Sequence, residues 1–106
     1  MAIKTNDIDS YYIRQYCALS WELAASIYCY YRTDHMGTLN FYKDGVTIPA
    51  GKLTSDGRIF LNFKEQYFGD IIETLRLEKP LYINIDDRVF WGYLSTSKEP
   101  IGEEEA

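Results

Sequence analysis

The sequence predicts an α+β fold, an antiparallel β-meander of about five to six strands with one main helix, residues 64–78, packed on one face. Short runs rich in β-branched and aromatic residues are separated by turn dipeptides, and one segment has a clear helical stripe. Of the 106 residues, 46% are hydrophobic, so the chain is expected to form a core by itself.

Residues 11–23 place mostly apolar or aromatic side chains at odd positions, an alternation typical of a strand with one buried face. A competing stripe with helical spacing runs through Ile8, Tyr12 and Tyr16. Aromatic and β-branched content favours the strand only weakly. Whether residues 8–24 form a strand or a helix is therefore left open by the sequence.

The middle of the chain has the pattern of successive strands. Residues 26–32 and 38–42 are dense in strand formers and predict a β-hairpin. Asp-Gly pairs at 44–45 and 56–57 are turn signals, because glycine adopts positive φ without steric cost. The second pair precedes an alternating strand over residues 58–63.

The main helix is predicted from its cap spacing and its apolar stripe. Asn62 and Glu65 have the spacing of a capping box, and Pro80 closes the segment. The stripe that should face the sheet consists of Phe68, Ile71, Ile72 and Leu75.

Two further strands are predicted at residues 81–85 and 89–94, joined by a short turn. Trp91 and Tyr93 would share one face of the last strand, while apolar residues also occupy the other face. A strand that is apolar on both sides is expected to lie centrally between layers or at an oligomer interface.

Charge divides the chain into a domain, residues 1–97, and an acidic, flexible C-terminal tail, residues 98–106. The formal net charge is −5, and residues 1–97 hold 12 acids against 10 bases. Because the bases are scattered singly, without the basic patch that nucleic acids require, no nucleic-acid binding is predicted. A cytoplasmic protein without membrane contact is expected, since the sequence has neither a long apolar span nor a signal-peptide pattern.

No metal site or cofactor is predicted. Cys17 and Cys29 are expected to be small core side chains, and His35 to be a solvated turn residue beside Asp34. Three possible Cys and His ligands without metal-site spacing do not make a structural zinc site. The seven glycines are dispersed rather than clustered at a strand–helix junction, so no phosphate-binding loop is predicted.

Two C-terminal runs and one upstream run carry a resemblance. They are Leu-Arg-Leu-Glu-Lys-Pro-Leu-Tyr at 75–82, the segment 92–103, and Gly-Thr-Leu-Asn-Phe-Tyr-Lys-Asp-Gly at 37–45. Together they resemble a group of small uncharacterised bacterial proteins of the mobile gene-cassette type. The resemblance implies a bacterial origin and a stand-alone domain, and no activity, cofactor or site residue.

The chain has more aromatic side chains than a single core of this size can easily hide. Adjacent tyrosines in a strand point to opposite faces, so some are expected to contact a partner or a ligand. The candidate ligand- or partner-binding residues are Tyr28, Tyr30, Tyr31, Tyr42, Trp91 and Tyr93. No catalytic residue is assigned.

These features favour a non-enzymatic interaction domain that self-associates, most simply as a homodimer. One alternative is a binding domain for a small apolar or aromatic ligand in a tyrosine-lined pocket. Another is an acidic inhibitor or immunity-type protein, which would be steered electrostatically onto a basic partner. An enzyme using Tyr82 with Asp86, or Asp34 with His35, is the weakest reading, because such groups need burial to shift a pKa.

Overall fold

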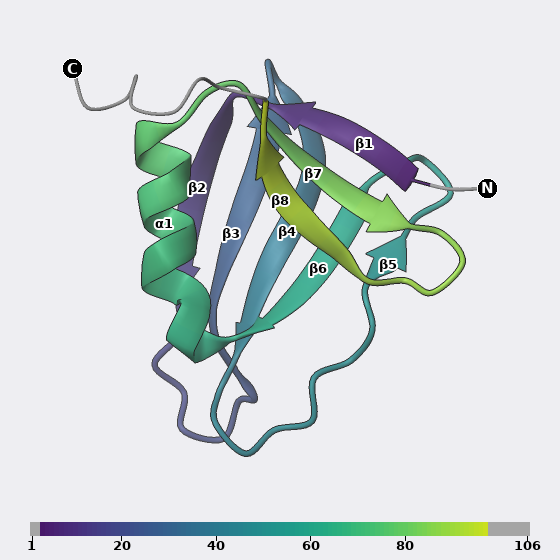
Figure 1. The fold of residues 1–106 in the computed structure, drawn as a ribbon. Coiled ribbons are helices and arrows are strands. Elements are labelled where there is room, and N and C mark those ends of the chain that lie inside the picture. Colours follow the sequence, from purple (N-terminus) through teal and green to yellow (C-terminus); the bar gives the residue numbers. More distant parts are fainter. Residues whose placement is uncertain (1–2, 98–106) are drawn as a thin grey trace.

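The computed structural model describes residues 3–97, which form eight β-strands in two sheets and one helix (Figure 1). The three-stranded sheet has the order β1 (Ile3–Ile8), β7 (Leu81–Asp86), β8 (Gly92–Thr96). The five-stranded sheet has the order β2 (Ser10–Gln15), β3 (Leu23–Tyr31), β4 (Asp34–Tyr42), β6 (Ile59–Lys64), β5 (Lys52–Leu53). The predicted α+β class with one helix is confirmed. The predicted tail, residues 98–106, lies outside the described residues.

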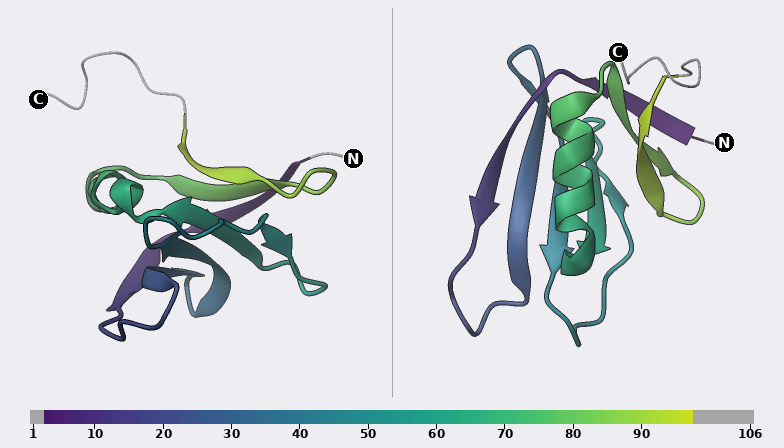
Figure 2. Two further views of the ribbon diagram at one scale, coloured as in Figure 1. Left: turned by 90° about the horizontal axis from the view of Figure 1, so that it is seen from below. Right: turned by 60° about the vertical axis from the view of Figure 1, so that its left-hand side comes forward.

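The chain bends at Asp9, between β1 and β2, and passes there from one sheet to the other. Its N–H donates to the carbonyl of Tyr30 at 2.8 Å, and its carboxylate oxygens accept the N–H of Arg32 at 3.0 and 3.1 Å. Arg32 lies in the turn between β3 and β4 with a φ of 60°, which is uncommon for a residue with a side chain. Asp9 therefore fixes both the bend and the neighbouring turn, and β1 and β2 run into separate layers (Figure 2).

The five-stranded sheet is not a simple meander, because β4 and β6 pair in parallel from Gly37↔Ile59 to Tyr42↔Lys64. Parallel neighbours need a crossover connection, and residues 43–58 supply it. This crossover contains only the short edge strand β5, which pairs antiparallel with β6. Since it has no helical pattern, its Asp-Gly turn signals alone predict an antiparallel meander. The expectations of antiparallel pairing throughout and of about five to six strands were therefore wrong.

The predicted helix at residues 64–78 is confirmed as a 3₁₀ turn, η1 (Glu65–Tyr67), that leads into α1 (Phe68–Leu77). The predicted cap is wrong, because Asn62 lies in β6 and no side chain caps η1. The predicted apolar stripe does pack against the core, where Leu75 is buried.

The core lies between the two sheets and α1. Phe41 is fully buried, stacks on Phe63 with ring centroids 5.4 Å apart, and meets Phe68 of α1 edge-on at 5.1 Å. Buried aliphatic residues of β3, β4, β6 and β7 surround this aromatic group. We call this side of the five-stranded sheet its inner face; α1 and the three-stranded sheet lie over it (Figure 2).

The predictions for residues 3–24 are corrected in two places. Strand β1 was missed because a buried polar residue, Asn6, interrupts the apolar pattern; its amide donates to the carbonyls of Met36 and Gly57 at 3.0 and 2.8 Å. The helix alternative for residues 8–24 is wrong, because β2 ends at Gln15 and residues 16–22 are irregular.

The last predicted strand begins later than expected. Strand β8 starts at Gly92, and residues 89–91 belong to the turn after β7. Phe90 has a φ of 59°. Its N–H donates to the carbonyl of Asp86, and the N–H of Asp86 donates to the carbonyl of Trp91, which is the arrangement of a β-bulge. Strand β8 is an edge strand, so the first of the two predicted positions, a central one, is wrong, and the second, an oligomer interface, stays a prediction.

We expect Gly37→Ala to destabilise the fold. A Cβ at this position would lie 2.2 Å from the carbonyl oxygen of Ile59 and 2.5 Å from Cδ1 of Ile83, so the β4–β6 pair must shift. Urea unfolding followed by circular dichroism should show a loss of about 1–3 kcal/mol. Gly69→Ala is the control: its Cβ would meet nothing within 4 Å, and it should stabilise α1 by about 0.5–1 kcal/mol. Equal stability of Gly37→Ala and the unchanged protein would contradict the packing described here.

Candidate functional site

The outer face of the five-stranded sheet is opposite the core, and it carries a group of aromatic side chains. In the β2–β3 pairing Tyr12 is opposite Tyr28, so both side chains point to the same face. Tyr30 lies two residues further along β3, and His35 of β4 is opposite Tyr30. We call the surface defined by Tyr12, Tyr28, Tyr30 and His35 the tyrosine face.

The rings of the tyrosine face contact one another directly. Tyr12 stacks on Tyr28 with centroids 4.9 Å apart and an interplanar angle of 12°, and on Tyr30 at 5.9 Å. The Arg14 guanidinium carbon lies 5.0 Å from the Tyr28 ring centroid, within the range of a cation–π contact. These contacts restrict the orientation of the rings on an otherwise open surface.

Hydroxyl contacts join the same rings. A hydrogen bond between Tyr12 and Tyr30 raises the pKa of Tyr30, and one between Tyr16 and Tyr28 raises the pKa of Tyr28. Burial raises the pKa of Tyr16, but hydrogen bonds with Ser26 and Tyr28 and the charge of Arg14 outweigh it, so the net shift is downward. The tyrosine face therefore presents an ordered set of phenolic donors and acceptors.

His35 closes the cluster on the β4 side. Its ring lies 5.4 Å from Tyr30 and 5.9 Å from Tyr28. Arg58 Nη1 lies 3.3 Å from Nδ1, and because a guanidinium can only donate, Nδ1 accepts and Nε2–H donates to the Thr38 hydroxyl at 2.9 Å. Burial, helped by the charge of Arg58, lowers the pKa of His35. His35 is thus a half-buried, hydrogen-bonded ring rather than the solvated turn residue predicted.

A row of polar side chains crosses the same outer face beside the aromatic rings. The Ser26 hydroxyl donates to Asn40 Oδ1 at 2.7 Å, and Asn40 Nδ2 donates to Asn62 Oδ1 at 3.2 Å. Asn62 Nδ2 in turn donates to the carbonyls of Pro49 and Ala50 at 3.1 and 3.0 Å. This network orders the outer face across three strands and attaches the crossover loop to its edge.

The structure brings together only two of the six predicted binding residues, Tyr28 and Tyr30. Tyr42 shares their face by strand alternation but lies at the other end of β4, where burial and then the charge of Glu22 raise its pKa. Tyr31 points elsewhere: the Arg32 guanidinium carbon lies 5.2 Å from its ring centroid. Sequence reasoning missed Tyr12, although the alternation of residues 11–15 placed it opposite the buried side chains.

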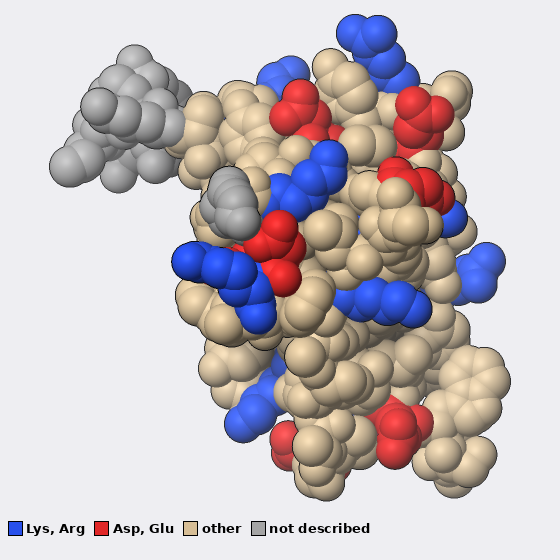
Figure 3. Space-filling view, turned by 90° about the vertical axis from the view of Figure 1, so that its right-hand side faces the viewer, with Lys and Arg blue, Asp and Glu red and all other residues tan. Residues whose placement is uncertain are grey.

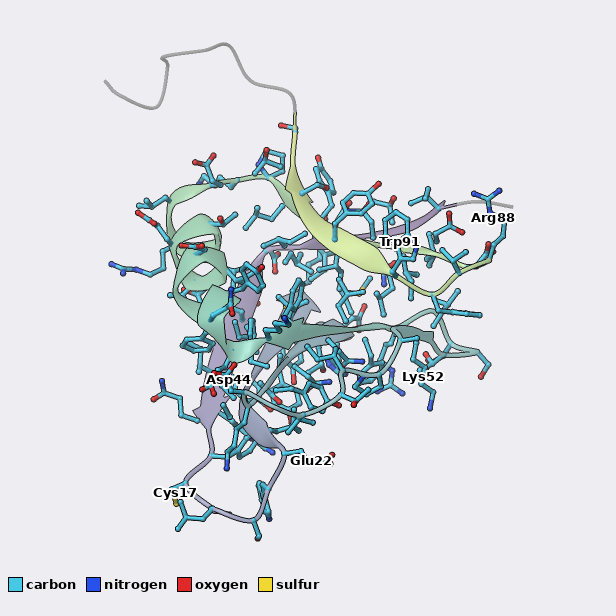
Figure 4. The ribbon with its side chains drawn as sticks, turned by 60° about the horizontal axis from the view of Figure 1, so that its bottom comes forward. Cys17, Glu22, Asp44, Lys52, Arg88 and Trp91 are labelled. Atoms are coloured by element: carbon cyan, nitrogen blue, oxygen red, sulfur yellow. The ribbon has the colours of Figure 1, made fainter. Side chains whose placement is uncertain are left out.

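Trp91 and Tyr93, the remaining two predicted residues, belong to the β7–β8 hairpin. Trp91 is 64% exposed, and its neighbours Val89 and Phe90 are 52% and 41% exposed. The N–H of Gly51 donates to the carbonyl of Phe90 at 2.6 Å, which ties this turn to the crossover loop. We call residues Val89, Phe90 and Trp91 the aromatic turn; it lies well away from the loop that carries Cys17 and Glu22 (Figure 4).

Two surface hollows lined by tyrosines are open to solvent. One, of about 640 Å³, includes Tyr31 and Tyr82 together with Lys79. The other, of about 380 Å³, lies between α1 and β8 and includes Tyr67 and Tyr93. The predicted tyrosines are therefore divided among three surfaces rather than gathered around one pocket.

The two predicted acid–base pairs are not formed. Asp86 is bound by Arg88, which donates from Nε at 3.1 Å and from Nη2 at 2.9 Å, and these bonds lower the pKa of Asp86 to about 2. His35 bonds to Thr38 and Arg58 rather than to Asp34. No group of three or more possible metal ligands occurs within residues 3–97.

The cysteines differ from one another. Cys29 is fully buried, and burial raises its pKa to about 12, as expected for a core side chain. Cys17 is exposed, so the prediction that it lies in the core was wrong. Neither forms a disulfide.

Basic and acidic side chains are intermixed on the side of the molecule that carries β5 and the β7–β8 hairpin (Figure 3). This side does not form the continuous acidic patch that would steer the chain onto a basic partner. No helix within the described part of the chain is long and apolar enough to cross a bilayer.

Comparisons of the chain with family models, with curated proteins and with solved structures return no match. The resemblance to gene-cassette proteins therefore stays a prediction, and function has to be argued from the geometry alone.

We expect the Asp86–Arg88 contact to stabilise the hairpin in a pH-dependent manner. The pKa of Asp86 is about 2 in the folded chain, against about 3.9 for a free aspartate, so its contribution is present above about pH 4 and is lost as the pH falls toward 2. The melting temperature of Asp86→Asn should lie below that of the unchanged protein at pH 7. The gap should narrow between pH 4 and 2. Asp44→Asn, on an exposed loop, is the control, and a gap independent of pH would contradict the assignment.

Proposed function

We propose that this chain is a non-enzymatic interaction domain that binds an acidic protein surface through the tyrosine face. The observation that carries the proposal is the ordered cluster of stacked tyrosines on the outer face of the sheet, which no described element covers. Stacked and hydrogen-bonded tyrosines lose little conformational freedom when a partner binds, and tyrosine is enriched at the energetic centres of protein interfaces.

The charges around the tyrosine face favour an acidic partner. By strand alternation, the outward positions of β2, β5 and β6 include three bases, Arg14, Lys52 and Lys64. Within the described strands of this sheet no Asp or Glu takes an outward position beside them. Two acids lie next to these strands: Asp56, in the turn before β6, is paired with Arg58 at 2.8 Å, and Glu22, just before β3, raises the pKa of Tyr42 by its charge. The whole chain carries a net charge of −5, so the outer face is more positively charged than the rest of the molecule.

A protein fits this face better than a single-stranded nucleic acid. Bases bind to sheet surfaces by stacking on exposed aromatic ring faces. Here Tyr12 stacks on two other tyrosines, and the Arg14 guanidinium lies over the Tyr28 ring. The groups left to meet a partner are hydroxyls, ring edges and cations, which suit carboxylates and polar side chains.

We expect binding to an acidic polypeptide to depend on Arg14. Fluorescently labelled poly-L-glutamate, followed by anisotropy, should bind the unchanged chain with an affinity that falls as salt rises. Arg14→Glu should weaken binding about tenfold or more, because it adds repulsion to a lost attraction. Arg76→Glu, an exposed change on α1 remote from the tyrosine face, is the matched control and should have little effect.

Tyr28→Ala tests the aromatic part of the surface separately. It should weaken binding as well, whereas Tyr28→Phe keeps the stack with Tyr12 and should retain most of the affinity. Tighter binding to oligo-dT than to poly-L-glutamate would replace the protein partner by a nucleic acid. Equal effects of Arg14→Glu and Arg76→Glu would remove the tyrosine face as the site.

Self-association through the aromatic turn is a second candidate function, and a separate observation favours it. Three consecutive apolar residues are exposed there, and Phe90 is held in the left-handed region although it is bulky. Such strained conformations persist where the surrounding structure enforces them and are concentrated at functional sites. A two-fold axis beside this turn would bury the same residues on both copies, as in most homodimers.

Sedimentation equilibrium at concentrations up to about 1 mM distinguishes the dimer from a monomer. We expect the mass to rise toward that of a dimer. Trp91→Ser should abolish this rise, because it removes the indole ring from the interface. Trp21→Ser is the control, since Trp21 is also exposed (52%) but lies in the loop between β2 and β3. A monomer throughout this range would exclude the dimer and leave the tyrosine-face proposal intact.

A further inference from the structure

The groove between α1 and β8 has an apolar lining and one acidic residue. Phe63 of β6 lines it together with Gly92, Tyr93 and Leu94 of β8. The α1 side contributes Ile71, Thr74 and Asp70, with Tyr67 just before the helix. Its volume is about 380 Å³, which is in the size range of ligand sites. The groove lies on the inner side of the five-stranded sheet, so it is distinct from the tyrosine face.

One wall of this groove is an unpaired strand edge. The N–H of Asp86 donates to the carbonyl of Trp91, and bonded pairs alternate along an antiparallel ladder. It follows that the backbone groups of Tyr93 and Ser95 bond to β7, whereas those of Gly92, Leu94 and Thr96 point away from it. Among residues 3–97 these outward groups have no hydrogen-bond partner. An edge of this kind is a template for an additional strand.

The position of α1 limits what can pair with this edge. Figures 1 and 2 show α1 beside the free edge of β8, on the side away from β7. A second copy pairing through its own β8 would bring a whole sheet into the space that α1 occupies. A single extended segment needs only one strand width, about 4.8 Å from β8. The geometry therefore favours an isolated strand over another sheet.

The charge on the α1 side of the groove indicates which kind of segment would bind there. Asp70 lines the groove, and no described cation pairs with it. Asp70 is the only charged residue among the described residues that line the groove. The chain's own residues 98–106 contain four glutamates and one lysine, which would be repelled by this wall. A segment with basic residues is complementary to it.

We infer that this groove binds an extended, basic segment of another protein, which adds as a fourth strand to β8. Its backbone pairs with Gly92, Leu94 and Thr96, its apolar side chains alternate toward Phe63, Ile71 and Leu94, and a lysine or arginine meets Asp70. Backbone pairing supplies the affinity, and the apolar lining with Asp70 supplies the sequence preference.

The inference is tested with blocked, fluorescein-labelled peptides and the full chain. Val-Lys-Val-Lys-Val should give saturable anisotropy and shift the NMR signals of the Gly92, Leu94 and Thr96 amides. The same peptide N-methylated at alternate residues should lose binding, because it cannot pair with the edge. Val-Glu-Val-Glu-Val should bind more weakly by about fivefold or more. Failure of the tyrosine-face experiments would not affect these results, since the two surfaces share no residue.

Two variants on α1 test the contribution of the Asp70 charge to binding. Asp70→Lys should reverse the preference between the two peptides, whereas Glu73→Lys, which does not line the groove, should leave it unchanged. Equal effects of the two variants, equal binding of the N-methylated peptide, or shifts confined to Tyr28 and Tyr30 would overturn the inference. Slow hydrogen exchange of the Leu94 and Thr96 amides in the free chain would also overturn it, because the edge would already be covered.

Discussion

The bend at Asp9 is the constraint on which the arrangement of both sheets depends. The N–H and the carboxylate of Asp9 both bond to the end of the β3–β4 hairpin, so the chain passes at this residue from β1 in one sheet to β2 in the other. The two sheets therefore share one continuous run of chain at a common edge. Of the opposite edges, β5 is only two residues long, and the loop before it is attached to the aromatic turn. Strand β8 is thus the longer open edge.

Much of the fold could be predicted from local patterns. The α1 stripe and strand β6 lie close to where the sequence placed them, and the β3–β4 hairpin is present, although β4 begins at Asp34 rather than at residue 38. The misses occur where a polar side chain or a non-local pairing replaces the apolar pattern. Asn6 is buried by bonding to two carbonyls, and the parallel β4–β6 pair depends on a crossover without helical character.

The candidate site was predictable only in part, because an aromatic residue has the same local signal whether it faces the core or solvent. Tyr28 and Tyr30 were identified from a surplus of tyrosines, but the register that places Tyr12 opposite Tyr28 is a property of the β2–β3 pairing. The sequence predicts a solvated His35 because its contacts come from distant segments, the tyrosine rings from β3 and Arg58 from the turn before β6. Sequence spacing contains no information on such cross-strand neighbours.

The pairing of β1 with β7 determines when β1 gains its partner during synthesis. Thr5 bonds to Asn84 across 79 positions of the chain, whereas β2 pairs with β3 as its nearest neighbour. During translation the five-stranded sheet has all its strands once residue 64 has emerged, while β1 has no partner until residues 81–86 follow. When β1 finally gains its pairing partner, all the strands that carry the tyrosine face have already been synthesised.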